Sequence, residues 1–163
     1  SRDWSSDVCS SDLETPSRIV EAVVKVNDAR KRAMGRKVLH ALNDEGKGKT
    51  VAVLGLTFKP DTDDMRDAPS LSIVQALLDA GVTVRAFDPE GMEMAKKEMP
   101  SITYCKDAYD AAAGADAVAI VTEWNEFRAL DLKRLGDVMA GKVMVDLRNV
   151  YSAAEAEGAG FSY

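Results

Sequence analysis

The fold of this chain is decided by residues 51–70, VAVLGLTFKPDTDDMRDAPS. The first six residues form a short apolar run rich in β-branched side chains, which is typical of a strand buried on both faces. Gly55 allows a turn where a Cβ would obstruct the backbone. Asp67 is suited to cap the helix that follows, and Pro69 fits the first turn of that helix. The stretch therefore predicts a strand, a turn, a polar loop and a helix start.

Apolar runs and amphipathic segments alternate from this stretch onward. The pattern predicts further strands at 82–87, 102–105, 117–121 and 142–147. It predicts helices at 68–80, 90–98, 107–113 and 125–140, the last of them broken near Leu130 and Asp131. Strands that alternate with helices indicate an α/β fold, a Rossmann-like doubly wound parallel sheet with right-handed crossovers.

One long helix precedes this sheet. Apolar residues recur three or four apart over residues 18–42, and a polar break follows at 43–49. One helix cannot form a core, so we expect it to belong to another domain. We divide the chain into the end of a helical domain at 14–46 and an α/β domain at 47–163.

The first thirteen residues, SRDWSSDVCSSDL, show neither helical nor strand periodicity. Residues 7–13 resemble the translation of a common sequencing adapter, and we interpret residues 1–13 as a disordered artefact. A disordered natural tail is the alternative. A clean genomic read that keeps this segment inside a longer gene would reject the artefact.

Composition limits the function. A net charge of −6 argues against a nucleic-acid partner, and no run of 18 apolar residues predicts a membrane span. The two cysteines, Cys9 and Cys105, have no pairing or metal-binding spacing, so we expect a reducing cytoplasm and no metal. His40 is the only histidine, and we place it on a helix surface.

Three cations follow strands at the predicted carboxyl edge of the sheet, where such folds bind ligands. Lys59 and Arg66 follow the first strand, and Arg148 follows the last. If they converge on one crevice, they suit a phosphate, with Phe58 offering a face to a base or ribose. The alternatives are a solvated Lys59, a core Phe58 and an Arg66 that pairs with neighbouring aspartates.

A dinucleotide site in this sheet is not expected. The G-x-G-x-x-G fingerprint requires three glycines, and only Gly55 is present. Asp88 could bind a ribose hydroxyl or simply form a turn before Pro89, and Trp124 is expected to pack as a lid. No general base–nucleophile pair emerges, so the residues indicate a nucleotide-binding module.

The motifs that carry these residues also resemble a known family. GLTFKPxTDDxRxAPS at 55–70, FDP at 87–89, TEWxEF at 122–127 and DxRNxY at 146–151 are similar to the UDP-binding carboxyl-terminal domain of the UDP-glucose/GDP-mannose dehydrogenase family. The resemblance covers residues 15–163, and Pro60 with Ala68-Pro69-Ser70 is more similar to the UDP-glucose 6-dehydrogenases than to the GDP-mannose enzymes.

The resemblance implies the oxidation of UDP-glucose to UDP-glucuronate by two NAD. It implies that Phe58 and Lys59 hold UDP, that Arg148 contacts substrate, and that Arg66 reaches NAD bound on another domain. The helix at 17–42 resembles the end of the family's central helical segment, which forms a homodimer.

This sequence also departs from the family pattern. The glycine-rich NAD domain and the catalytic cysteine in a Gly-Gly-Ser-Cys-Phe-Pro-Lys-Asp context are absent, and residues 159–163 resemble the family's last strand cut short. We therefore expect a fragment that binds UDP weakly and catalyses nothing alone. The alternatives are a UDP-N-acetylmannosamine or GDP-mannose dehydrogenase, a free-standing nucleotide-binding module, or a flavodoxin-like regulatory domain whose cations form salt bridges.

Overall fold

A parallel sheet forms the centre of the molecule in the computed structural model, which describes residues 18–163. Within this range five strands pair in the order β3-β2-β1-β4-β5. Their bounds are β1 Thr50–Leu54, β2 Thr83–Phe87, β3 Thr103–Tyr104, β4 Ala117–Ile120 and β5 Val143–Asp146. The parallel sheet predicted from the sequence is confirmed. The interpretation of residues 1–13 lies outside the described residues.

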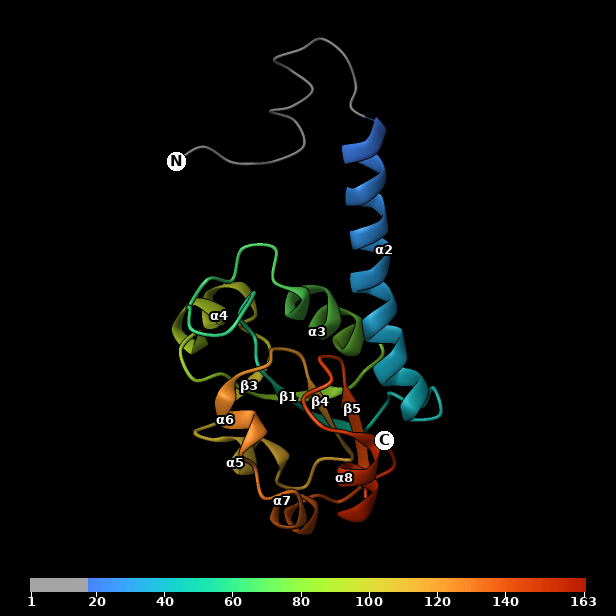
Figure 1. Ribbon diagram of the computed structural model, residues 1–163, viewed down its shortest axis with the longest axis vertical. Coiled ribbons are helices and arrows are strands. Elements are labelled where there is room, and N and C mark those ends of the chain that lie inside the picture. Colours follow the sequence, from blue (N-terminus) through green and yellow to red (C-terminus); the bar gives the residue numbers. More distant parts are fainter. Residues whose placement is uncertain (1–17) are drawn as a thin grey trace.

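Helices cover both faces of the sheet (Figure 1). One face carries α2 (Arg18–Ala41), α3 (Pro69–Asp79) and α4 (Met92–Glu98). The opposite face carries α5 (Ala108–Ala112), α6 (Asn125–Arg128), α7 (Leu132–Val138) and α8 (Ala153–Gly158). The sheet is therefore doubly wound, and the predicted break near Leu130 separates α6 from α7.

Strand β1 lies in the middle of the sheet and is buried on both faces, as its apolar run predicted. Val51 and Val53 pack into the core beneath α3, while Ala52 and Leu54 pack into the core beneath α5. The chain order reverses between β1 and β4, because the connections beside them run on opposite faces. Sheets of this kind bind ligands at the carboxyl ends of the strands beside such a reversal.

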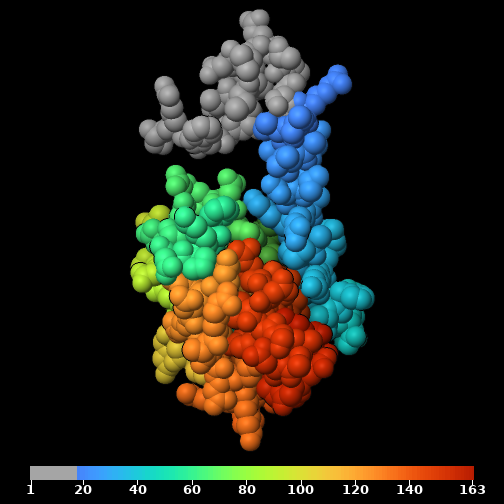
Figure 2. Space-filling model, in the orientation of Figure 1, coloured from blue at the N-terminus to red at the C-terminus, as the bar shows by residue number. Residues whose placement is uncertain are grey.

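Helix α2 has two halves with different surroundings. Its carboxyl-terminal half packs against α3 so closely that a Cβ on Gly35 would lie 2.8 Å from the Cβ of Ala76. Its amino-terminal half stands clear of the α/β body (Figure 2) and exposes Ile19, Val23 and Val26. The middle of α2, residues 24–34, forms one wall above the carboxyl edge of the sheet.

The predicted helix cap at Asp67 is wrong. The residue before α3 is Ala68, which forms no side-chain cap, and Pro69 begins the helix as expected. Asp67 has φ +54, and its side chain is 92% exposed, 4.0 Å from Lys31 of α2. The backbone of Asp67 is left-handed, and its side chain points toward α2. It therefore does not cap α3.

The last residues return to the sheet edge. Ser162 forms an isolated parallel bridge with Val143, so the chain runs beside β5. The N–H of Met144 donates to the carbonyl of Ser162 at 2.9 Å, and the N–H of Ser162 donates to the carbonyl of Lys142 at 2.7 Å. This pairing is a single isolated bridge, and the resemblance of residues 159–163 to the family's last strand stays a prediction.

Candidate functional site at the carboxyl edge of the sheet

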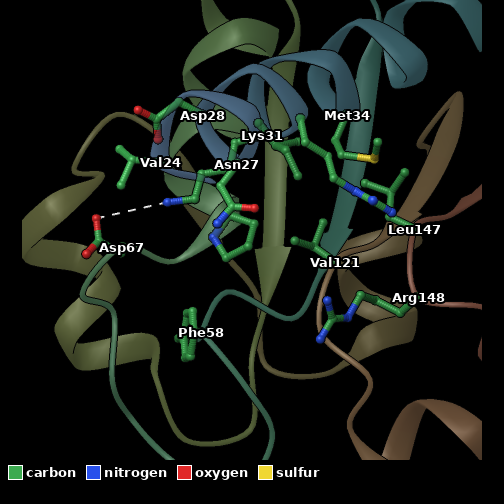
Figure 3. A pocket seen from close by; sticks show the side chains of 13 residues that line it. Val24, Asn27, Asp28, Lys31, Met34, Phe58, Asp67, Val121, Leu147 and Arg148 are labelled. Carbon is green, nitrogen blue, oxygen red and sulfur yellow. Dashed lines mark ion pairs between the residues drawn. The ribbon is translucent and has the colours of Figure 1, made fainter. Parts of the chain in front are cut away.

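A hollow of about 510 Å³ lies between α2 and the carboxyl edge of the sheet (Figure 3). Its walls come from α2, the loop after β1, the start of α3 and the ends of β4 and β5; they are Val24, Asn27, Asp28, Arg30, Lys31, Met34, Phe58, Asp67, Pro69, Ile73, Val121, Leu147 and Arg148. Phe58 and Arg148 lie across from the α2 residues. Two of the four predicted site residues therefore line one hollow.

The turn after β1 is tightly packed against the loop after β4. Gly55 has φ +88, and a Cβ there would lie 2.5 Å from the Cβ of Thr122. Glycine therefore serves both the left-handed backbone and the close approach of the two segments. This turn directs the following residues, Phe58 and Lys59, out over the sheet edge.

Phe58 is a surface aromatic. Its side chain is 49% exposed, so the alternative of an ordinary core phenylalanine is wrong. Its N–H donates to the carbonyl of Asp64 at 2.9 Å, which closes the loop between them. Phe58 thus lines the hollow with about half of its surface exposed.

Lys59 is exposed and does not line the hollow. Within residues 18–163 its ammonium forms no ion pair within 4.0 Å. The positive charge of the residue after Phe58 is therefore exposed to solvent and available to an anion. Its role in phosphate binding stays a prediction.

Arg66 pairs with Asp64 two residues earlier. Its Nε lies 3.0 Å from Oδ1 and its Nη2 lies 2.8 Å from Oδ2. These hydrogen bonds from Arg66 lower the pKa of Asp64 to about 2. Arg66 is 85% exposed and does not line the hollow, so the local pairing considered as its alternative is present and its contact with a cofactor stays a prediction.

Arg148 forms an ion pair that the sequence analysis missed. Its guanidinium binds the carboxylate of Glu123 through Nε and through Nη2, the latter at 2.8 Å from Oε1. The hydrogen bond from Arg148 lowers the pKa of Glu123 below its usual value. The signal was available, because the segment 122–127 and Arg148 follow strands that lie side by side.

Asp146 fixes the turn that carries Arg148. Its carboxylate accepts the N–H of Arg148 at 2.9 Å, of Val150 at 2.6 Å and of Tyr151 at 2.9 Å. These bonds accommodate Asn149, whose φ is +53. Asp146 thus satisfies the backbone of the turn and fixes the position from which Arg148 extends.

The predicted convergence of three cations on one crevice is only partly present. Arg148 lines the hollow, whereas Lys59 is outside its lining and Arg66 pairs with Asp64. Lys31 from α2, which the sequence analysis did not single out, lines the hollow as well. The site combines an exposed aromatic ring with cations on several sides.

Three other residues considered in the sequence, Cys105, His40 and Trp124, do not line the hollow. Cys105 is buried, and burial raises the pKa of its thiol. His40 is exposed, 3.4 Å from Asp44. Trp124 is buried, as predicted for a packing residue. Residues 18–163 contain no cluster of three or more metal-ligating side chains, and no helix among them is long and apolar enough for a bilayer.

Comparison with known proteins gives the site its context. Residues 52–153 match the model of the UDP-glucose/GDP-mannose dehydrogenase family, UDP binding domain. The chain belongs to this family. It is 56% identical over 152 residues to a UDP-glucose 6-dehydrogenase of Rhizobium meliloti (strain 1021), covering 93% of this chain and 35% of that protein.

Solved structures agree with the fold. A UDP-glucose dehydrogenase from Pyrobaculum islandicum superposes with a TM-score of 0.75 at 32% identity, over 91% of this chain and 33% of that one. An NDP-N-acetyl-D-galactosaminuronic acid dehydrogenase from Methanosarcina mazei Go1 gives 0.79 at 28% identity, over 93% and 32%. The chain spans about a third of the length of the relatives it matches.

Proposed function

We propose that this chain binds the UDP part of UDP-glucose, as the nucleotide-binding domain of a UDP-glucose 6-dehydrogenase. The observation that carries the proposal is the placement of Phe58 and Arg148 on one hollow at the carboxyl edge of the sheet. A chain 56% identical to a UDP-glucose 6-dehydrogenase supports this choice of nucleotide sugar.

Each residue has a role that suits a nucleoside diphosphate. The exposed face of Phe58 offers a surface to the planar base or the ribose. Arg148 presents a planar fork that matches phosphate oxygens, and Lys59 adds an exposed point charge next to Phe58 in the chain. Glu123 keeps the Arg148 fork oriented toward the site until an anion competes for it.

The complete enzyme, in this proposal, oxidises UDP-glucose to UDP-glucuronate with two NAD. Residues 18–163 do not fit NAD in the manner of a dinucleotide cradle, since the space over Gly55 is filled by Thr122. The exposed Arg66 instead suits a contact with NAD carried by another part of the protein. We expect no turnover from these 163 residues alone.

The domain division belongs to the same proposal. We assign residues 14–46 to the end of the family's central helical domain and 47–163 to the UDP-binding domain. The exposed apolar residues at the start of α2 support a helical neighbour there. We propose a homodimer for the full-length enzyme, no nucleic-acid partner and a cytoplasmic location.

Calorimetry on the 163-residue chain tests the function. We expect UDP to bind at one site per chain, more tightly than inorganic phosphate, because the base adds its contact with Phe58. Absence of UDP binding would overturn the proposal. Tighter binding of GDP than of UDP would favour a GDP-mannose dehydrogenase, and equal binding of UDP and phosphate would favour a general anion site.

A further inference from the structure

Asp88 is a buried carboxylate that receives hydrogen bonds from three separate segments. It follows β2 and is 1% exposed. Its Oδ2 accepts the N–H of Leu56 at 2.6 Å and of Thr57 at 3.1 Å, from the turn after β1. The same oxygen accepts the indole N–H of Trp124 at 3.2 Å, from the loop after β4.

The other oxygen serves the backbone next to Asp88 itself. Oδ1 accepts the N–H of Glu90 at 3.1 Å and of Gly91 at 2.7 Å. One carboxylate thus joins the loops after β1, β2 and β4 at the carboxyl edge of the sheet. We propose that Asp88 is a positioning residue, which fixes the segment Phe58–Lys59 for nucleotide binding; this inference rests on the proposed function.

The connection from Asp88 to the binding segment is short. Leu56 and Thr57, whose N–H groups it accepts, directly precede Phe58. The hydroxyl of Thr57 lies 3.2 Å from Asp88 Oδ2 and 3.1 Å from the carbonyl oxygen of Lys59, and shares its one proton between them. Thr122 donates its hydroxyl to the carbonyl of Thr57 at 2.7 Å. The backbone that leads into Phe58 and Lys59 is therefore held on both its donor and acceptor sides.

The burial of this charge shows that its hydrogen bonds matter. A carboxylate removed from water is costly unless donors or cations replace the water. No cation within residues 18–163 pairs with Asp88, so its negative charge is met by neutral N–H and O–H donors. Charge-assisted bonds of this kind are stronger than neutral ones. A side chain that only filled space at position 88 would not require a carboxylate, so the hydrogen bonds of Asp88 are its function in the fold.

The same geometry rules Asp88 out as a ribose ligand. An ionised carboxylate offers about four lone-pair positions, and six donor contacts from the protein already surround it. The residue is also closed off from solvent. The sequence left two roles open for Asp88, and the ribose contact is therefore wrong. Asp88 instead forms its own turn and also binds the loops after β1 and β4.

The variant Asp88→Asn tests the proposal, because the amide replaces one acceptor oxygen with a donor. We expect UDP affinity, measured by calorimetry on folded protein, to fall on the order of ten- to a hundredfold. The reason is that Phe58 and Lys59 would be displaced from the positions in which they contact UDP. We also expect faster amide hydrogen exchange at Leu56 and Thr57, with exchange at Val53 of the preceding strand β1 unchanged.

Asp116→Asn is the matched control. Asp116 also binds a neighbouring strand, because its carboxylate accepts the N–H of Thr50 at 2.9 Å and a hydrogen bond from the Lys49 ammonium at 3.3 Å. These contacts lie at the amino ends of the strands, away from the hollow. This variant should lose stability and keep its UDP affinity. If loss of stability alone weakened binding, UDP affinity would fall equally in both variants, and the proposal would be overturned.

The remaining outcomes separate this inference from the proposed function. Unchanged UDP affinity in folded Asp88→Asn overturns the positioning role alone. If the wild-type chain binds no UDP, the proposed function fails. Unchanged hydrogen exchange at Leu56 and Thr57 in Asp88→Asn would then overturn the positioning role as well.

If Asp88→Asn does not fold, a second variant, Thr57→Val, removes only the hydroxyl between Asp88 and Lys59. Severalfold weaker UDP binding by this variant supports the proposal, and unchanged binding rejects it.

Discussion

The guanidinium of Arg148 and the carboxylate of Glu123 form a two-point ion pair across the adjacent loops after β4 and β5. The pair orients a cation at the hollow, and it also places a negative charge beside the position that we propose for a phosphate. Arg148 is only partly exposed, with 35% of its side chain accessible. An incoming anion must therefore compete with Glu123.

Glu123→Gln should strengthen UDP binding severalfold, because the amide keeps a hydrogen-bond acceptor for Arg148 and removes the repulsive charge. Calorimetry at low and high salt measures this, and the gain should shrink as salt screens the charge. Glu126→Gln, on the exposed surface of α6, is the matched control and should bind like wild type. Weaker binding in Glu123→Gln would mean that the charge is needed to orient Arg148.

Lys59→Ala should weaken UDP binding. The loss of a charge-assisted hydrogen bond costs about 1.5–3 kcal/mol, which corresponds to roughly a ten- to hundredfold higher dissociation constant. Lys133→Ala removes an exposed lysine from α7 on the opposite face of the sheet and should leave the affinity unchanged. Equal affinity of Lys59→Ala and wild type for UDP would remove Lys59 from the site.

The central strands could be predicted because their pattern is local. The run at 51–56 is apolar at every position but Gly55, and β1 is indeed buried on both faces. The carboxyl-edge location of the site then followed from the parallel topology. Phe58 and Arg148 reach the same hollow because both follow strands of this one sheet.

Side-chain direction could not be predicted in the same way. Arg66 turns to Asp64 because a carboxylate lies two residues away, and the sequence offered four aspartates as partners. Asp67 failed as a cap because its backbone is left-handed, a property of the folded loop. The contacts of Asp88 with Leu56 and Trp124 join segments more than thirty residues apart, so no local pattern contains them.

Gly55→Ala should destabilise the chain more than Gly114→Ala. Both glycines have positive φ, and this alone costs about 1–2 kcal/mol for a residue with a Cβ. Gly114 has open space around it, whereas a Cβ on Gly55 would lie 2.5 Å from Thr122. The added overpacking costs about 1–3 kcal/mol. Urea denaturation measures both, and equal losses would show that the turn relaxes around the new methyl group.

Leu77→Ala should cost about 2–5 kcal/mol of unfolding free energy. Leu77 lies on α3 and is fully buried in the core between that helix and the sheet. Gln75→Ala, on the exposed side of the same helix, should stay within about 0.5 kcal/mol of wild type. Urea denaturation of both variants is the measurement, and similar small losses in the two would contradict the placement of Leu77 in the core.

Stability should fall at alkaline pH because two tyrosines resist ionisation in the folded chain. Burial raises the pKa of Tyr104 and of Tyr151 to about 12. In the unfolded chain a tyrosine ionises near its ordinary value of about 10. The unfolded state therefore loses its tyrosine protons first. The stability that these two tyrosines contribute is fully present below pH 10 and declines as pH rises toward 12.

The variant Tyr151→Phe tests this pH dependence. It removes the hydroxyl that donates to the Phe127 carbonyl, which lowers stability at neutral pH. Its unfolding free energy should nevertheless fall less steeply between pH 10 and 12 than that of wild type. Equal slopes in the two chains would show that Tyr151 ionises alike in both states.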